Sequence, residues 1–195
     1  MRFTIASVFL LWIMIFSQAF TQSETNTNSN INGFGIGINA ELNWSQLPND
    51  NRIGISANTP FFLDRWVALR FEADYGLIRG IPVTNTLSNS IWANYYAFKA
   101  GIVVAANRRS DIIRPFIETG FIYIIPTSTF TSDTSAWGIY GLFGLDVSFP
   151  GDFSGYFFEI GGTGLLSPGG YADQYKGLMP YATGLNIVLG WRFYL

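Results

Sequence analysis

The last eleven residues of the chain, Leu185 to Leu195, read LNIVLGWRFYL, with apolar and polar side chains in regular alternation. Successive side chains of a β-strand point to opposite sides of a sheet, so this pattern predicts a strand with one apolar face. The apolar face carries Leu185, Ile187, Leu189, Trp191, Phe193 and Leu195, and the other carries Asn186, Gly190, Arg192 and Tyr194.

The same alternation recurs along the preceding residues and predicts seven more strands. They are expected at 33–44, 52–59, 67–75, 91–106, 114–125, 137–149 and 156–163. Turn residues separate some of them, at Pro48–Asn51, Asn107–Asp111 and Pro150–Gly155. Longer loops are expected at Arg79–Ser90, Pro126–Ser135 and Leu165–Met179. The strand number is even, and short connections alternate with long ones, as in outer-membrane barrels.

Composition favours a membrane protein that crosses the bilayer with strands. Charged residues make up 12% of the chain, against about 25% in ordinary soluble domains, and aromatic residues make up 17%. After the first twenty residues, no apolar run is long enough for a membrane-spanning helix, which leaves closed β-barrels as the spanning structure. The predicted fold class is all-β, an eight-stranded antiparallel transmembrane β-barrel with up-and-down meander order.

The amino-terminal residues have the features of a secretion signal. Arg2 precedes an uncharged run, Ile5 to Phe16, which is shorter than the roughly twenty residues of a membrane helix. Small residues in Ser17-Gln18-Ala19 suit cleavage after Ala19, with Thr21 as the rival position. We therefore expect a signal peptide at 1–19, a flexible periplasmic leader at 20–32 and the barrel at 33–195. The chain has no cysteine, so neither a lipoprotein acylation site nor a disulfide is expected.

Alternation alone does not say which face of each strand lies inside the barrel. In a soluble lipocalin-like barrel the apolar face would point inward. Aromatic residues instead gather at both ends of the strands, which predicts two girdles bounding a membrane band. One set comprises Trp44, Tyr75, Trp92, Tyr123, Trp137 and Tyr181, and the other Trp66, Phe149, Tyr156, Trp191 and Phe193.

The closing strand and the segment RPFIETGF at 114–121 resemble strands of small bacterial outer-membrane barrels of the OmpA/OmpX type. The resemblance implies an outer-membrane location with both termini in the periplasm. It also implies that the insertion machinery reads Ile187, Leu189, Trp191, Phe193 and Leu195, although such proteins usually end in Phe rather than Leu. Expected partners are outer-membrane lipid and lipopolysaccharide, the insertion machinery, periplasmic chaperones and an extracellular ligand at the loops.

Nucleic acid is not expected as a partner, because the formal net charge of the chain is −2 and removal of Arg2 with the signal makes it more negative. The absence of histidine argues against the enzymes built on similar barrels, which use a histidine to move a proton. Without histidine or cysteine, zinc and most transition-metal sites are not expected either. Loop acids such as Asp133 and Asp173 are isolated and give only a weak calcium signal. We therefore predict no catalytic, metal or cofactor site.

The predicted inner face carries a set of charged residues. Glu72 and Asp74 lie two residues apart on one face, a spacing open to an acid–base pair. The alternative, which we favour, is a structural charge network in which neighbouring Arg70 neutralises them. The full predicted set is Glu41, Arg70, Glu72, Asp74, Lys99, Glu118, Asp146, Glu159 and Arg192.

Two glycine-rich stretches, Gly33-x-Gly35-x-Gly37 and Gly161-Gly162-Thr163-Gly164, invite a phosphate-loop interpretation, but no helix is expected after either. Glycine on an inner face more simply makes room for bulky neighbours or lets the sheet curve. The function expected from the sequence is therefore a structural or surface-interaction role without enzymatic activity. The alternative is a narrow passive channel, or a conduit for small apolar molecules.

Overall fold

The computed structural model describes residues 34–44, 50–63, 66–80, 91–106, 112–126, 135–148, 154–166 and 183–195. The predicted signal peptide and leader lie outside these residues. The described residues form eight strands: β1 (Gly35–Trp44), β2 (Asp50–Asn58), β3 (Val67–Gly80), β4 (Ile91–Ala105), β5 (Ile113–Ile125), β6 (Ala136–Ser148), β7 (Ser154–Leu165) and β8 (Gly184–Tyr194). Among the described residues there is no helix long and apolar enough to cross a membrane.

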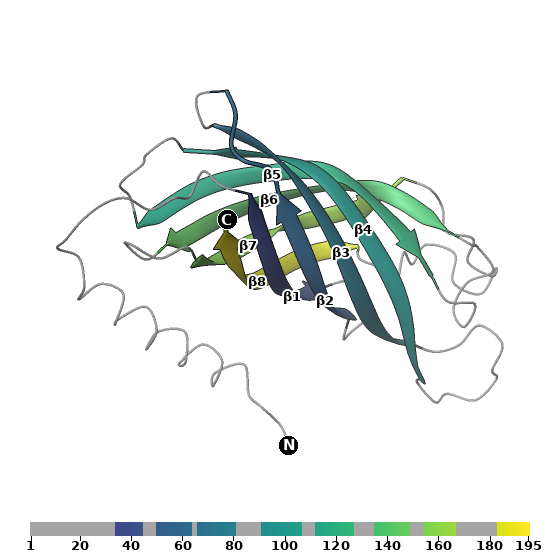
Figure 1. The fold of residues 1–195 in the computed structure, drawn as a ribbon. Helices are drawn as coiled ribbons and strands as arrows, with labels where there is room; N and C mark the ends of the chain where they lie inside the picture. The colour runs from purple at the N-terminus through teal and green to yellow at the C-terminus, as the bar shows by residue number, and fades with distance from the viewer. Residues whose placement is uncertain are drawn as a thin grey trace, which may run out of the picture.

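The eight strands form a closed antiparallel barrel in meander order (Figure 1). Each strand pairs with its neighbour in sequence, and β1 closes the barrel by pairing with β8 from Gly35 and Tyr194 to Trp44 and Leu185. A closed sheet has no edge strand with unpaired backbone groups. The predicted all-β, eight-stranded, up-and-down barrel is therefore confirmed.

The strands are strongly tilted relative to the barrel axis (Figure 1). We followed the register from Gly35 to its paired residue on the next strand, and so on around the barrel. The path returns to β1 just beyond Trp44, at the opposite end of the strand from Gly35. The steps pass through Asn58, Arg70, Gly101, Gly120, Tyr140, Thr163 and Gly184. A stagger of this kind accompanies strand tilts of about 35–45° in barrels.

Connections differ in length between the two ends of the barrel. At the end where β1 finishes, which we call the Trp44 end, the connections are 45–49, 81–90, 126–135 and 166–183. At the opposite end, the Tyr194 end, they are 59–66, 106–112 and 149–153. The longest connections therefore all lie at the Trp44 end.

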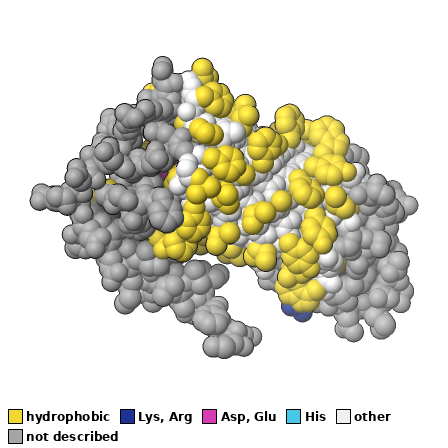
Figure 2. All heavy atoms as spheres, viewed as in Figure 1, with side chains coloured by type: hydrophobic (Ala, Val, Ile, Leu, Met, Phe, Trp, Pro, Cys, Tyr) yellow, Lys and Arg dark blue, Asp and Glu magenta, His cyan; other side chains and the backbone are white. Residues whose placement is uncertain are grey.

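The outer surface of the barrel is apolar (Figure 2). Ile38, Ile55 and Phe121 are 54%, 62% and 67% exposed, whereas charged residues on the same strands are buried. The exposed aromatics Trp44, Trp92, Tyr123 and Trp137 lie toward the Trp44 end. Toward the other end lie exposed Trp66 and Trp191 and half-buried Tyr156 and Phe193. Phe149 and Tyr181 of the predicted girdles lie outside the described residues. The apolar face thus points outward, opposite to a soluble barrel with an apolar core.

Several strand boundaries differ from those predicted. Asp50 and Asn51 belong to β2 rather than to a turn, and the Asp50 carboxylate accepts a 2.5 Å hydrogen bond from the Tyr95 hydroxyl inside the barrel. Leu165 belongs to β7, where it pairs with Gly138. Arg79, predicted to start a loop, pairs with Trp92. In each case cross-strand pairing extends beyond the residues whose alternation is visible in the sequence.

Strands β3 and β4 extend past their neighbours at the Trp44 end. Pairing between them continues to Gly80 and Ile91, whereas β2 stops at Asp50 opposite Ile78, and β5 pairs with β4 only from Tyr96. We call this two-stranded extension, 79–80 with 91–95, the β3–β4 arm.

Candidate functional site

The candidate site is the barrel lumen, because the structure brings all nine predicted charged residues together there. Each is at most 6% exposed, and every one of them takes part in at least one ion pair. The alternation of each strand explains this placement, since its apolar side chains occupy the outer face. The ion pairs fall into two groups.

The first group, the Lys99 cluster, consists of Glu41, Arg52, Glu72, Asp74 and Lys99 on strands β1 to β4. The Lys99 ammonium donates to Glu41 and Glu72 at 2.7 Å each and lies 3.3 Å from Asp74. Arg52 pairs with Glu41 and lies 3.7 Å from Asp74. Two cations are therefore paired with three carboxylates in this part of the lumen.

The second group, the Arg70 cluster, consists of Arg70, Glu118, Asp146, Glu159 and Arg192. Arg70 on β3 pairs with Glu118 on β5 and with Glu159 on β7. Since β3 and β7 are on opposite sides of an eight-stranded barrel, the Arg70–Glu159 pair crosses the lumen. Arg192 on β8 donates to Asp146 on β6 at 2.7 Å. The cluster therefore links five strands through side chains as well as backbone.

One predicted pairing is wrong. We expected Arg70 to neutralise Glu72 and Asp74, but their cationic neighbour is Lys99, and Arg70 pairs elsewhere. Lys99 lies directly opposite Glu72 in register on the adjacent strand β4, and this brings its ammonium close to both acids. The Arg70 guanidinium extends instead toward β5 and β7.

Other lumen residues were missed by the sequence analysis. Arg52 was detectable, because alternation from Ile53 and Ile55 places it on the inner face. Asp50 lay in a predicted turn, and Arg114 was the first residue of a predicted strand, where alternation is weakest. With these three, seven carboxylate side chains and five cations are buried among the described residues, against six and three in the predicted set. An amide chain was also missed, in which Asn43 donates to Asn186 at 2.8 Å and Asn186 to Thr163 at 2.6 Å.

Aromatic side chains fill the space between the charges. Phe116, Phe157 and Tyr95 lie directly opposite glycines in register, Gly144, Gly190 and Gly76 respectively. A β-carbon on any of these glycines would overlap the ring that covers it. The rings also contact the cations: Arg192 lies 4.3 Å above the centroid of Phe157, and Arg70 lies 5.1 Å above that of Phe116. Inner-face glycines thus make room for bulky neighbours, as expected.

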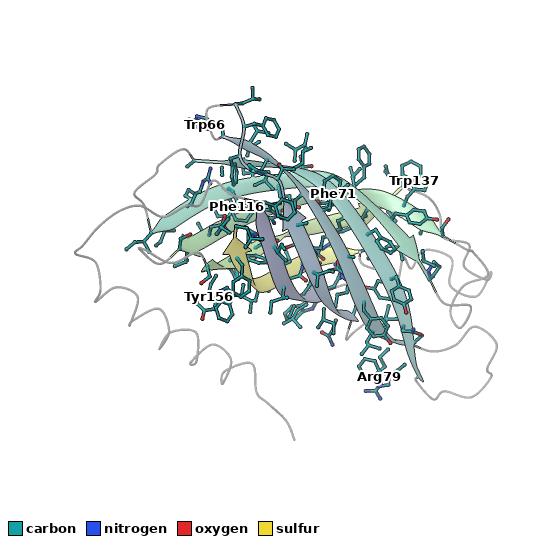
Figure 3. All side chains as sticks on the ribbon, in the orientation of Figure 1. Trp66, Phe71, Arg79, Phe116, Trp137 and Tyr156 are labelled. Atoms are coloured by element: carbon teal, nitrogen blue, oxygen red, sulfur yellow. The ribbon has the colours of Figure 1, made fainter. Side chains whose placement is uncertain are left out.

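Buried apolar residues lie on both sides of the charged layer. Toward the Trp44 end they include Ile78, Tyr95, Ile124, Leu142 and Leu165. Toward the Tyr194 end the set is Phe61, Ala68, Val103, Ala105 and Phe116. There Arg114 stacks on Phe61 at 3.8 Å and donates to the Ala106 carbonyl at 2.9 Å. The lumen therefore has a charged middle between two apolar layers, and Figure 3 shows Phe116 inside the barrel while Phe71 and Trp137 lie on its wall.

The arrangement offers little for catalysis or metal binding. Carboxylate oxygens of Glu41, Glu72 and Asp74 lie within 4.8 Å of one another, the spacing of a cation site, but the Lys99 ammonium binds to all three. Some buried polar atoms have no hydrogen-bond partner within the described residues, including the Asn39 amide, the Ser56 hydroxyl and Arg192 Nε. Internal water normally satisfies such groups. A groove of about 740 Å³ lies along the mostly apolar barrel wall, and its lining includes Phe71, Phe98 and Phe121 as well as Glu72 and Lys99.

The predicted insertion signal occupies the outer face of β8. Ile187, Leu189, Trp191 and Phe193 alternate with buried Val188, Arg192 and Tyr194, and Leu195 is 71% exposed. Trp191 stacks on Tyr156 and Phe193, with centroids 5.4 Å and 5.1 Å apart. Recognition of this face of β8 by the insertion machinery stays a prediction.

No model of a known protein family matches the sequence, and no curated protein is significantly similar to it. Two solved structures share the fold. The N-terminal β-barrel domain of Pseudomonas aeruginosa OprF is 14% identical, with a TM-score of 0.55, over 84% of this chain and 98% of that domain. The outer-membrane protein OprG from the same organism is 11% identical, with a TM-score of 0.57, over 88% of this chain and 99% of OprG. At these identities the likeness concerns the fold alone: the chain has the fold of small outer-membrane β-barrels.

Proposed function

We propose that this protein is an integral barrel of the bacterial outer membrane with a structural or surface-interaction role and no enzymatic activity. The apolar outer wall supports this, because its exposed Ile, Phe and Trp side chains would be unfavourable in water and are suited to lipid. Aromatic residues toward both ends of that wall suit the two interfaces of a bilayer. The shared fold with OprF and OprG points in the same direction.

The observation that carries the proposed role is the filled lumen. An eight-stranded barrel is just wide enough for its own side chains. Here the lumen contains two clusters of ion pairs, aromatic rings packed against glycines, and apolar residues toward each end. A lumen of this kind supports a stable scaffold rather than an open path for solutes.

We place the Trp44 end outside the cell, because outer-membrane barrels carry their longer loops there and short turns in the periplasm. Both termini then lie in the periplasm. The connections 81–90, 126–135 and 166–183 are the candidate surface for an extracellular ligand. Periplasmic chaperones and the insertion machinery would deliver the barrel, and lipid and lipopolysaccharide would surround it.

The absence of an enzymatic role is part of the proposal. The chain has no histidine and no cysteine, so the common proton-transfer and nucleophile pairs are lacking. The two acids of the alternative catalytic pair, Glu72 and Asp74, share Lys99 and are 6% and 3% exposed. Both therefore have an ion-pairing partner and little access to a substrate.

Recording from the mature protein in a planar bilayer tests the closed lumen. We expect no steady open conductance, because ion pairs and aromatic rings occupy the path. A shift between unboiled and boiled samples on a gel controls for folding of the same preparation. Steady, cation-selective currents from folded protein would contradict the closed lumen and favour the alternative, a narrow passive channel.

A further inference from the structure

The hydrogen bonds between β2 and β3 are irregular at the Tyr194 end of the barrel. The Thr59 amide donates to the Leu69 carbonyl at 2.9 Å, and the Phe62 amide donates to the Val67 carbonyl at 2.8 Å. Between these two bonds the first segment advances by three residues, whereas the second advances by only two. Two residues of the first segment therefore lie opposite one of the second, which is the arrangement of a β-bulge.

The bulge consists of Pro60 and Phe61, opposite Ala68, and it changes which of the two side chains points inward. Asn58 points into the lumen, so regular alternation would turn Pro60 inward and Phe61 outward. The structure has the reverse, because Pro60 is exposed and Phe61 is 9% exposed. Bulges redirect side chains in this way, and proline is tolerated there because it has no N–H to pair. The extra residue therefore brings a phenyl ring into the end of the barrel.

The phenyl ring occupies a space that the barrel wall does not fill by itself. Near this end the inner faces of β3 and β4 carry only small or medium side chains, Ala68, Val103 and Ala105, which are at most 1% exposed. Phe61 belongs to the same buried apolar cluster. The next inner residue along β3 is Arg70. Phe61 therefore lies between the Arg70 cluster and the Tyr194 end of the lumen.

Arg114 on β5 holds the Phe61 ring in place. The guanidinium carbon of Arg114 lies 3.8 Å from the ring centroid, and its Nε donates to the Ala106 carbonyl at 2.9 Å. Contacts of a cation with a ring face are strongest where water is excluded, and Arg114 is 5% exposed. Phe116, which Figure 3 labels inside the barrel, completes the apolar layer at this end. The Phe61 ring is thus fixed by the small residues of β3 and β4 and by a cation.

The two ends of the lumen are closed by different parts of the chain. Every described member of the apolar cluster toward the Trp44 end belongs to a strand, as Ile78, Ile124 and Leu165 do. Toward the Tyr194 end, Phe61 comes from outside the strands, at the point where the β2–β3 ladder is interrupted. We propose that Phe61 is a stopper that closes the lumen at the Tyr194 end, and that its withdrawal opens the Arg70 cluster to water from that end alone. This inference refines the closed lumen of the proposed function and rests on it.

The test is the reactivity of a single engineered cysteine in the folded mature protein, because the chain has no cysteine of its own. Val103→Cys places a thiol beneath Phe61, at a position that is 0% exposed, and a charged methanethiosulfonate in detergent micelles reports its access to water. The thiol should react slowly while Phe61 is present. Adding Phe61→Ala should raise the reaction rate at least about tenfold, because the wall cannot collapse into the space left by a phenyl ring.

Two controls separate the stopper from a general loosening of the barrel. Phe62→Ala truncates the adjacent ring, which is 43% exposed on the outside, and should leave the rate at Val103→Cys unchanged. A thiol in the apolar layer toward the Trp44 end, Ala136→Cys, should stay protected in the Phe61→Ala background. Phe61→Leu is a milder truncation that should raise the rate by less, and it replaces Phe61→Ala if that variant does not fold.

Fast reaction at Val103→Cys with Phe61 present, or equally slow reaction after its truncation, would overturn the stopper. Equal acceleration at Val103→Cys and Ala136→Cys would also overturn it, because the opening would then not be confined to the Tyr194 end. The bilayer recording of the wild type distinguishes these results from failure of the proposed function. Steady current from the wild type contradicts the closed lumen, whereas a silent wild type with a protected thiol in Phe61→Ala contradicts the stopper alone.

Discussion

Replacing Arg70 with methionine is expected to lower the free energy of unfolding by about 3–5 kcal/mol, the cost of removing one partner from a buried ion pair. Arg70 is 1% exposed and pairs with Glu118 and Glu159 inside the lumen, so its loss leaves both carboxylates without their main cation. Methionine keeps much of the apolar length of the side chain and removes the guanidinium, which lies over the Phe116 ring. Urea titration in detergent micelles, followed by tryptophan fluorescence, measures the change.

The matched control removes Arg70 together with the charges of its two partners, Glu118 and Glu159. In Arg70→Met/Glu118→Gln/Glu159→Gln no uncompensated carboxylate of this trio remains, and the Tyr140 hydroxyl, 2.7 Å from Glu118, keeps an acceptor. We therefore expect the triple variant to be more stable than Arg70→Met alone. If Arg70→Met is as stable as the wild type, the Arg70 cluster does not stabilise the barrel.

Replacing Ile55 with arginine is expected to cost about 2–4 kcal/mol of stability in lipid vesicles, as for arginine on the lipid face near the bilayer midplane. Ile55 lies midway along β2 and is 62% exposed on the outer wall, between Ile38 and Ala73 of the adjacent strands. Reversible urea unfolding in vesicles measures the difference from wild type.

The control for this substitution is Ile55→Leu, which keeps the apolar character and should change stability little. If arginine at this position costs nothing, the outer wall is in contact with water, and the membrane location proposed for the barrel is contradicted.

The sequence predicted the fold because apolar and polar residues alternate with a period of two along each strand. Once Ile36, Ile38 and Leu42 are seen on one face of a strand, the side on which Asn39 and Glu41 lie follows. Eight such segments with turn residues between them then define a barrel wall. Strand ends were less predictable, since alternation fades there while pairing continues, as at Arg79 with Trp92.

The sequence predicted that the charged side chains point into the lumen, but it did not predict which residues form ion pairs. Register within a strand fixes which residues point inward, whereas partners depend on how strands distant in sequence approach across the lumen. Arg70 and Glu72 are sequence neighbours, yet Arg70 reaches Glu118 and Glu159, which lie on β5 and β7. The seating of Phe116 on Gly144 likewise depends on the relative register of β5 and β6, which no single strand specifies.

Spin labels on alternate residues test the membrane barrel most directly. The chain has no cysteine, so a single engineered cysteine carries each nitroxide. In lipid vesicles, labels at Ile117 and Phe121 on the outer face of β5 should collide with dissolved oxygen and be shielded from a water-soluble nickel chelate. Labels at Ile122 and Leu142, which point inward, should be immobile and reached by neither. Chelate access at Ile117 and Phe121 equal to that of a label in water would contradict the account.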